Sequence, residues 1–334
     1  MRKLLVLIIF VFLVSNHYGQ SFESRHFTIE KLDDGVYAVI HKTGGYAICN
    51  SGIVDLGDQT LVFDCFISPE AARDLKKTAV ELTGHKVKYL INSHFHNDHI
   101  RGNQVFTDAE IISTERTKEL IEENEPEELK WEAEVVDQRI KTTLEQMSAE
   151  TDSFKLEEDK MWLGYYKAIK ESLDEYKITP PNVFLKDTML IKGNKREAIL
   201  FTEGKGHTES DIVLWLPKEK ILFAGDILFV ECHPWLGDGF AADWVNYLND
   251  LKKLNANFIV PGHGPVGNNQ NIEQMISYIN IITNLVDNAI EKNVTKDELK
   301  AAVIPDEYKT WTLSRFFSPN LVIQYGIKTG TSKE

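Results

Sequence analysis

Four candidate metal ligands, His94, His96, Asp98 and His99, lie within six residues of one another. The preceding residues Val87–Ile91 have the β-branched and aromatic content of a strand. In an extended chain His94 and His96 point to the same side, because side chains alternate with a period of two. Asp98 and His99 follow where the chain leaves the strand and enters a helix. Four such groups are costly to bury unpaired, and imidazoles and carboxylates bind zinc-like cations. The segment predicts a metal site with room for two ions.

Three further candidates, His207, Asp226 and His263, each come just beyond a short apolar run that predicts a strand. A single histidine in a loop, or a single Gly-Asp turn, is more often structural than functional. Taken together, however, each of the three presents its side chain just past the carboxyl end of a strand, where loops can converge on one site. We therefore expect these three residues to join the first four.

The elements that must position these residues are predicted in two sets of strands, each followed by helices. The first set has strands at 35–41, 52–55, 60–63 and 87–91 and a helix at 69–83 that ends near Gly84. The second has strands at 198–202, 211–216, 221–224 and 258–260, a helix at about 244–254, and a helical C-terminal part with a capping box at Thr295 and Glu298. This order favours a layered α/β sandwich over one wound sheet.

Between the two sets, residues of about 115–176 are strongly acidic, and their apolar positions recur at near-helical spacing. They predict a helical insertion of two helices in an otherwise single domain, 20–334. Two interpretations remain open. The helices are surface helices with solvated outer faces, or they form a lid or wall over the site.

The first 19 residues predict a secretory signal peptide. Arg2 and Lys3 precede eleven apolar residues at 4–14, and a cleavage site follows at Gly19 or Gln20. Eleven apolar residues are too few to span a bilayer. We therefore expect an exported protein, periplasmic or secreted, that keeps no stable membrane anchor after cleavage.

The overall charge restricts the partners. The chain has 37 basic and 51 acidic residues, for a net charge of −14. Such a surface repels phosphate backbones, so we expect a small-molecule substrate and no nucleic acid. Oligomeric state is left open. The three cysteines, an odd number, are no disulfide framework. Cys49 and Cys65 either pair across a predicted hairpin or are buried thiols.

In order along the chain, the motifs resemble those of the metallo-β-lactamase superfamily. They are Asp64 in Leu-Val-Phe-Asp, the segment His94–His99, His207, Asp226 and His263. The resemblance extends from residue 22 to about residue 267. It implies an α/β fold, a four-layer αββα sandwich with the metals at one edge between the sheets.

The resemblance also implies a division of the ligands. His94, His96 and His207 would hold one metal ion. Asp98, His99 and His263 would hold the second, and Asp226 would bridge the two. Asp64 would lie behind the ligands and orient the histidine loop, as outer partners of metal ligands generally do.

This ligand set predicts hydrolysis. Three neutral imidazoles leave the first zinc Lewis acidic with an open position, and a water between two cations should ionise near neutral pH. Asp98 is placed to take up or pass on a proton, so it is the candidate catalytic residue. We expect the substrate bond to be an ester, lactone, thioester or amide. Two Zn²⁺ are the expected cofactors, although Asp98 and Asp226 make the second site hard enough for iron or manganese.

Several residues of this chain differ from those usual in well-known branches of the superfamily, and these differences bear on the substrate. The commonest class B β-lactamases have a Cys at the fourth motif and a Lys three residues later, where this chain has Asp226 and Phe229. An Asp at the fourth motif resembles the glyoxalase II and lactonase branches, but Arg101 replaces the first Gly of their usual Asp-His-x-Gly-Gly-Asn. Four aromatic residues are candidates to line the substrate pocket, Phe229, Trp235, Tyr165 and Tyr166, while His233 is expected to be structural.

Three alternatives remain beside this hydrolase. The chain could be a class B-like β-lactamase, since the segment from His207 to Leu216 is very similar to that group. It could be a dioxygenase that binds a single iron and acts on persulfides, or a metal-binding protein without catalysis. Metal analysis separates these, because two zinc ions support the hydrolase and one iron supports the dioxygenase.

Overall fold

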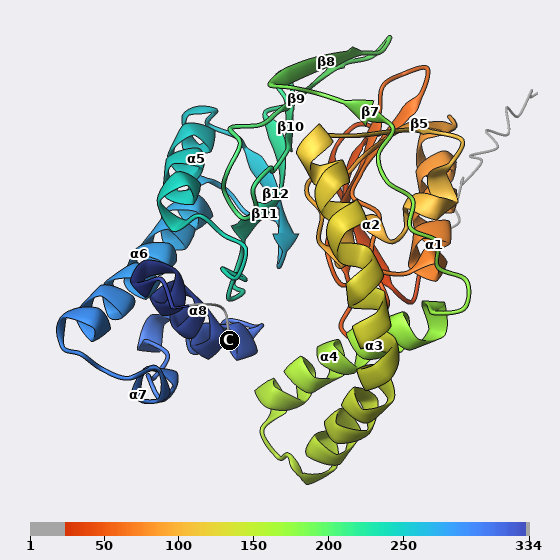
Figure 1. Ribbon diagram of the computed structural model, residues 1–334. Coiled ribbons are helices and arrows are strands. Elements are labelled where there is room, and N and C mark those ends of the chain that lie inside the picture. Colours follow the sequence, from red (N-terminus) through yellow and green to blue (C-terminus); the bar gives the residue numbers. More distant parts are fainter. Residues whose placement is uncertain (1–23, 332–334) are drawn as a thin grey trace, which may run out of the picture.

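The computed structural model describes residues 24–331, so the predicted signal peptide lies outside the described residues. These residues form two β-sheets that face each other (Figure 1). The first sheet has the spatial order of its sequence: β1 (Phe27–Asp33), β2 (Val36–His41), β3 (Ser51–Asp55), β4 (Thr60–Phe63), β5 (Val87–Ile91), β6 (Glu110–Ser113) and β7 (Val183–Phe184). Strands β1 to β4 pair antiparallel, and β4 to β7 pair parallel.

The second sheet has five strands in the order β12 (Phe258–His263), β11 (Ile221–Phe229), β10 (Val213–Leu216), β9 (Glu197–Phe201) and β8 (Thr188–Lys192). The pair β11 and β12 is parallel, and the other pairs are antiparallel. The predicted strands therefore occur in two sheets, and each sheet mixes parallel and antiparallel pairs.

Helices cover the outer face of each sheet (Figure 1). On the first sheet lie α1 (Pro69–Thr83), α2 (Asn97–Ile100) and η1 (Asn103–Phe106). On the second lie α5 (Ala241–Lys253), α6 (Asn269–Glu291), α7 (Lys296–Lys300), η2 (Asp306–Tyr308), η3 (Ser314–Phe316) and α8 (Phe317–Thr329). Helix α1 ends as predicted at Gly84, whose φ of 74° gives a left-handed cap, and the predicted capping box begins α7.

Side chains point alternately to the two faces of each sheet, and the apolar ones form three layers. In the first sheet Ile53 and Val62 pack toward α1, whereas Val54 and Leu61 pack toward the other sheet. The central strands β3, β4, β10 and β11 are buried on both faces, as strands in the middle of a sandwich must be. The order helix, sheet, sheet, helix confirms the predicted α/β sandwich.

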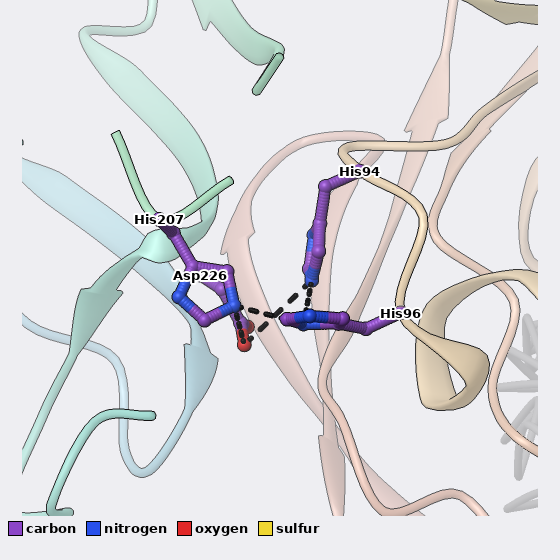
Figure 2. Close-up of side chains that lie close together, drawn as sticks. All are labelled: His94, His96, His207 and Asp226. Atoms are coloured by element: carbon purple, nitrogen blue, oxygen red, sulfur yellow. Dashed lines mark hydrogen bonds and ion pairs between the residues drawn. The ribbon is translucent and has the colours of Figure 1, made fainter. Parts of the chain in front are cut away.

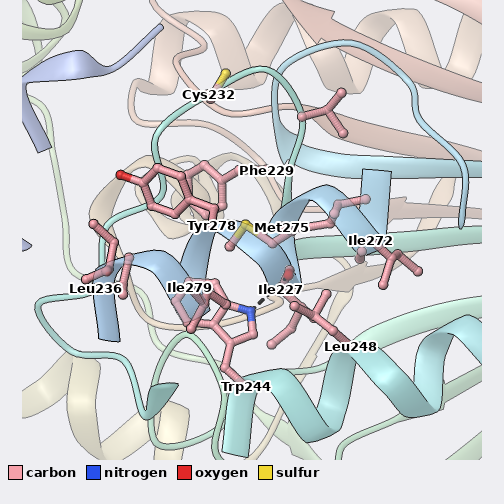
Figure 3. Close-up of a cluster of buried hydrophobic side chains, with 14 of the residues drawn as sticks. Ile227, Phe229, Cys232, Leu236, Trp244, Leu248, Ile272, Met275, Tyr278 and Ile279 are labelled. Atoms are coloured by element: carbon pink, nitrogen blue, oxygen red, sulfur yellow. Dashed lines mark hydrogen bonds between the residues drawn. The ribbon is translucent and has the colours of Figure 1, made fainter. Parts of the chain in front are cut away.

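The largest apolar layer lies between the second sheet and the helices α5, α6 and α8 (Figure 3). Trp244 on α5 is fully buried there, and its Nε1 donates a hydrogen bond to the Ile227 carbonyl at 2.9 Å. Met275 and Ile279 on α6 are also fully buried. This layer holds β11, which carries Asp226, firmly against its helices.

The acidic segment forms two antiparallel helices, α3 (Glu115–Ala149) and α4 (Ser153–Ser172). They reach beyond the sheets at the bottom of the view in Figure 1. The side chains of Thr114 and Asp152 cap their N-termini. That the pair is an insertion in the fold stays a prediction. Within residues 24–331, none of the helices combines the length and apolar character needed to cross a bilayer.

Candidate metal centre

The seven candidate ligands come from both sheets. From the first sheet, the loop after β5 carries His94 and His96, and α2 carries Asp98 and His99. The second sheet contributes three ligands, from the β9–β10 loop, β11 and β12: His207, Asp226 and His263. Loops, a short helix and two strands, separated by more than a hundred residues in the chain, thus converge on one place.

In the first cluster three imidazole nitrogens face one point. His94 Nε2 lies 3.0 Å from His96 Nδ1, and His207 Nε2 lies 2.9 Å from the same nitrogen. Asp226 Oδ2 is 3.3 Å from His207 Nε2 and 3.9 Å from His94 Nε2. Figure 2 shows His94 and His96 approaching from one side and His207 with Asp226 from the other. The four side chains are spaced as ligands to one cation.

The second cluster shares Asp226 with the first. Asp226 Oδ1 lies 3.1 Å from His99 Nε2, while Asp226 Oδ2 lies 3.5 Å from His263 Nε2. Asp98 Oδ2 completes the cluster, at 3.3 Å from His263 Nε2 and 3.7 Å from His99 Nε2. The Asp226 carboxylate therefore lies between two adjoining groups of His and Asp side chains, an arrangement suited to a two-metal site.

Two buried atoms in this centre fit a metal ion. Within residues 24–331, His99 Nε2 and Asp226 Oδ1 are buried and make no well-directed hydrogen bond; their polar contact is with each other at 3.1 Å, and a cation between them would satisfy both. Burial lowers the pKa of His94 well below its usual value and that of His207 to about 3. Both imidazoles are therefore neutral and able to coordinate.

In the second cluster, the carboxylates determine which side chains carry protons. Burial opposes a charge on His263, but Asp226 and Asp98 outweigh this and raise its pKa to about 9. Burial likewise opposes ionisation of Asp98, but His99 and His263 outweigh it and lower the Asp98 pKa to about 2. In the metal-free centre, a proton on His263 balances the carboxylates. A metal ion must displace that proton, so metal affinity should rise with pH.

Asp64 lies behind the ligands, where it was predicted to support the histidine loop. It follows β4 directly and is fully buried, with a φ of 59°. Its carboxylate accepts hydrogen bonds of 2.8 Å from the Ser93 backbone N–H and from the Ser93 hydroxyl, and it lies 2.8 Å from His99 Nδ1. These contacts fix the ring of His99 with Nε2 directed at the centre.

Asp238 is a supporting carboxylate that no sequence pattern indicated. Its Oδ2 lies 3.2 Å from His96 Nε2, and it accepts a 3.0 Å hydrogen bond from Trp235 Nε1. Burial lowers the pKa of His96, but the Asp238 carboxylate outweighs this effect and the pKa is raised. The only signal in the sequence was a carboxylate three residues after Trp235, and nothing linked it to His96.

Asp226 and His263 lie within strands, which corrects the prediction that both follow strand ends. The pairing of β11 with β12 shifts at Gly225, whose φ is 52°, and continues to the pair Phe229–His263. This irregularity turns Asp226 toward the centre, as bulges often do for functional side chains. A Cβ at Gly262 would lie 1.8 Å from Asp226 Oδ1, so only glycine allows β12 to pass so close to that carboxylate.

Comparison with known proteins assigns the family. The sequence pattern described as the metallo-beta-lactamase superfamily matches residues 44–263, well over half of the 334 residues. The chain belongs to the metallo-β-lactamase superfamily. Solved structures agree in fold. DIM-1 metallo-β-lactamase has a TM-score of 0.55 at 19% identity, with coverage of 78% of this chain and 99% of that one. A metallo-β-lactamase from Pontibacter korlensis gives 0.55 at 17% identity, covering 76% and 99%.

Matches to curated relatives cover shorter stretches. Metallo-β-lactamase type 2 of Bacillus cereus is 40% identical over 72 residues, which are 20% of this chain and 28% of that protein. The β-lactamase-like protein 2 homolog of Caenorhabditis elegans is 24% identical over 252 residues, which are 71% of this chain and 64% of that protein. The chain thus spans about a quarter and just under two thirds, respectively, of these two relatives.

A cavity of about 680 Å³ opens over the centre of this superfamily member. Asp98, Asp226 and His263 are at its floor. The four aromatic residues predicted to line a substrate pocket, Phe229, Trp235, Tyr165 and Tyr166, all border it. Both acidic helices contribute walls. This position favours the interpretation of α3 and α4 as a wall over the site rather than a purely solvated pair.

Phe229 and His233 differ in their relation to the cavity. The Phe229 ring stacks on His263, with centroids 5.0 Å apart and planes 15° apart. It thus holds a candidate ligand in place besides bordering the cavity. His233 is fully buried elsewhere, 2.8 Å from the Tyr278 hydroxyl and 3.1 Å from the Tyr308 carbonyl. Its surroundings agree with the structural role expected for it.

Arg101, which stands where the glyoxalase II and lactonase branches usually have glycine, connects the metal loop to α3. Its guanidinium is buried and pairs with Glu125 at 3.1 Å and with Glu132 at 2.7 Å. Asn97, at the other end of α2, donates 2.7 Å and 3.3 Å hydrogen bonds to Glu128 and Glu132. Because α2 also carries two candidate ligands, the long helix and the metal loop are held as one unit.

The three cysteines are free and buried. The suggested pairing of Cys49 with Cys65 is thus not formed. Cys49 Sγ donates a 2.9 Å hydrogen bond to the Asp98 carbonyl, and Cys65 Sγ donates one of 3.1 Å to Asn103 Oδ1. Burial raises the pKa of Cys49 to about 12, so it is a protonated donor that supports the loop of Asp98.

Proposed function

We propose that this protein is an exported, dinuclear metal-dependent hydrolase that acts on an ester, lactone, thioester or amide bond. The observation that carries the proposal is the position of Asp226. Its buried carboxylate lies between a three-histidine cluster and a second cluster of His and Asp side chains, with Oδ2 directed at the first and Oδ1 at His99 of the second. A carboxylate so placed is explained by two cations that share it.

In this proposal His94, His96 and His207 hold the first metal ion, and Asp98, His99 and His263 hold the second. Two Zn²⁺ ions suit these nitrogen and carboxylate donors, and iron or manganese remains an option at the more oxygen-rich second site. When bound, the metals supply Lewis acidity and a water of lowered pKa.

The chain's own residues position the substrate and move the proton. Asp98 lines the floor of the cavity, and its Oδ2 lies 3.3 Å from His263 Nε2. Because the Asp98 carboxylate is ionised, it can accept a proton from the attacking water and pass it to the leaving group. Asp238 holds His96 in orientation, and Phe229 holds His263. Helices α3 and α4 line the cavity beside the reacting bond.

β-Lactam hydrolysis is the second candidate. The 40% identity to the Bacillus cereus metallo-β-lactamase over 72 residues favours it. Against it stands Phe229, which occupies the position where the commonest class B enzymes carry the lysine that binds the drug's carboxylate. The proposal of export rests on the predicted signal peptide 1–19 and is tested by the N-terminus of the mature protein in the periplasmic or secreted fraction.

The test is metal content together with turnover on the mature chain. We expect two zinc ions per chain, and hydrolysis of at least one member of a panel of lactones, aryl esters, thioesters and a cephalosporin. His94→Ala and Asp226→Ala should lose at least about a thousandfold in kcat/KM if the metals supply several kcal/mol of transition-state stabilisation. His85→Ala, a histidine outside the centre, is the matched control and should keep full activity.

One iron per chain with oxidation of a persulfide would instead support the dioxygenase. Two bound metals without turnover of any panel member would support the non-catalytic alternative. Full activity in Asp226→Ala would contradict the proposed centre itself.

A further inference from the structure

The cavity over the centre is lined along one face of α3. Its lining residues on that helix recur at helical spacing from Asn124 to Arg139 and include Glu128, Trp131 and Val135. Glu128 and Arg139 are eleven residues apart, which at 1.5 Å each separates them by roughly 16 Å. Glu128 lies at the metal end, because Asn97, the neighbour of Asp98, donates a hydrogen bond to it. Arg139 is at the far end.

The wall beyond the metal end is aromatic and apolar. On α4, Trp162 stacks with Tyr166 at 6.1 Å between ring centroids and meets Phe316 edge-on at 5.6 Å. Ile169 on α4 also lines the cavity. Across from them on α3, Trp131 leaves 53% of its surface exposed. A large aromatic side chain exposed on a concave, apolar wall indicates a site that a ligand covers.

Beside the proposed metal ions, the metal end of the cavity offers acidic side chains and, in the described chain, no lysine or arginine. Glu128, Glu132 and Asp238 all line this part of the cavity. Among the described lining residues the one lysine or arginine is Arg139, at the far end of the α3 face. Arg101 is close to this region but already pairs with two buried glutamates. A substrate carboxylate beside the reacting bond would thus find no lysine or arginine to pair with, and only the metal ions could neutralise it.

We propose that the substrate is a neutral ester, lactone or thioester with an extended apolar acyl chain, which lies between α3 and α4. The proposal rests on the hydrolase function above and specifies its substrate class. The reacting carbonyl lies at the floor formed by Asp98, Asp226 and His263. The chain then runs along the aromatic wall toward Arg139, and no carboxylate adjoins the reacting bond.

The first experiment is a chain-length series of p-nitrophenyl esters, from acetate to decanoate, with the zinc-loaded enzyme. Each buried methylene should raise kcat/KM by up to about fourfold until the cavity is filled. Trp131→Ala should flatten this dependence, because it lowers kcat/KM for decanoate more than for acetate. Leu144→Ala is the matched control, since Leu144 lies on the same helix, is 47% exposed, and does not line the cavity.

The second experiment separates this proposal from the hydrolase function. Binding of 1-octanol and of ethanol to the metal-free protein is measured by calorimetry, with no reaction required. We expect octanol to bind with a negative heat-capacity change, which Trp131→Ala weakens and Leu144→Ala does not. If octanol binds in this way while no ester is hydrolysed, the result supports the apolar chain site and contradicts the hydrolase function.

Three results would overturn the apolar-chain substrate. They are equal kcat/KM for acetate and decanoate, octanol binding that is the same in wild type and Trp131→Ala, or a preference for a cephalosporin over every neutral acyl ester.

Discussion

At the scale of single residues, the centre depends on carboxylates that bind no metal themselves. Asp64 fixes the His99 ring by its contact with His99 Nδ1, and Asp238 fixes the His96 ring by its contact with His96 Nε2. Both leave the opposite ring nitrogen directed at the cluster. A carboxylate behind a ligating histidine raises the basicity of the ring and restricts its rotation, so the orientation of His96 depends on a residue 142 positions away in the chain.

We therefore expect Asp238→Asn to weaken metal binding at the first cluster about tenfold to a hundredfold, because the amide keeps the shape but loses the charge. The measurement is competition with a chromophoric chelator at fixed pH. Asp187→Asn, an exposed aspartate outside the centre, should leave the affinity unchanged. Equal zinc affinity in both variants would show that Asp238 does not support His96.

At the scale of elements, the decisive contact is between α2 and α3. Helix α2 has four residues and cannot be stable alone. Arg101 at its end is buried between Glu125 and Glu132 of α3, and Tyr176 donates a 2.6 Å hydrogen bond to Glu125. The acidic helix thus has a structural task, which is to hold the short helix that carries Asp98.

Arg101→Met should destabilise the protein by about 3–5 kcal/mol, because it leaves two buried glutamates without their cation. The free energy of unfolding is measured by urea denaturation. Arg116→Met is the control: Arg116 is 35% exposed and pairs with glutamates at the surface, so its loss should cost about 0–1 kcal/mol. If Arg101→Met lowers the free energy of unfolding no more than Arg116→Met does, the coupling of α2 to α3 is contradicted.

At the scale of the whole molecule, the centre lies where the two sheets meet. His94, His96, Asp98 and His99 belong to segments after β5 of the first sheet, and the remaining candidate ligands belong to the second. Bound metal therefore links the two halves of the sandwich. A ligand that binds only the folded chain stabilises it by mass action.

Removal of metal with a chelator should lower the thermal midpoint, and zinc should restore it. At a free zinc concentration a thousand times its Kd, the expected stabilisation is about 4 kcal/mol. The effect should weaken as the pH falls below about 9, since His263 then holds a proton that zinc must displace. Differential scanning calorimetry with and without zinc is the measurement, and Asp226→Ala should respond much less. A midpoint independent of zinc would argue against a link between the sheets.

Much of the fold follows from local patterns. Strands β4 and β5 occur at the predicted residues because their apolar side chains pack on both faces, and α1 begins and ends with its capping residues, Ser68 and Gly84. β11 was predicted too short, because the chain resumes pairing after the shift at Gly225, and that pairing depends on β12 about 35 residues away.

The sequence alone determined the types and order of the candidate ligands, since few other roles explain so many imidazoles and carboxylates near predicted strand ends. Only the tertiary structure decided what lies behind and above them. The contacts of Asp238 with His96, of Arg101 with Glu125, and of the aromatic wall with the cavity join residues far apart in the chain. Such contacts depend on how the sheets and helices pack, which no local spacing in a single sequence encodes.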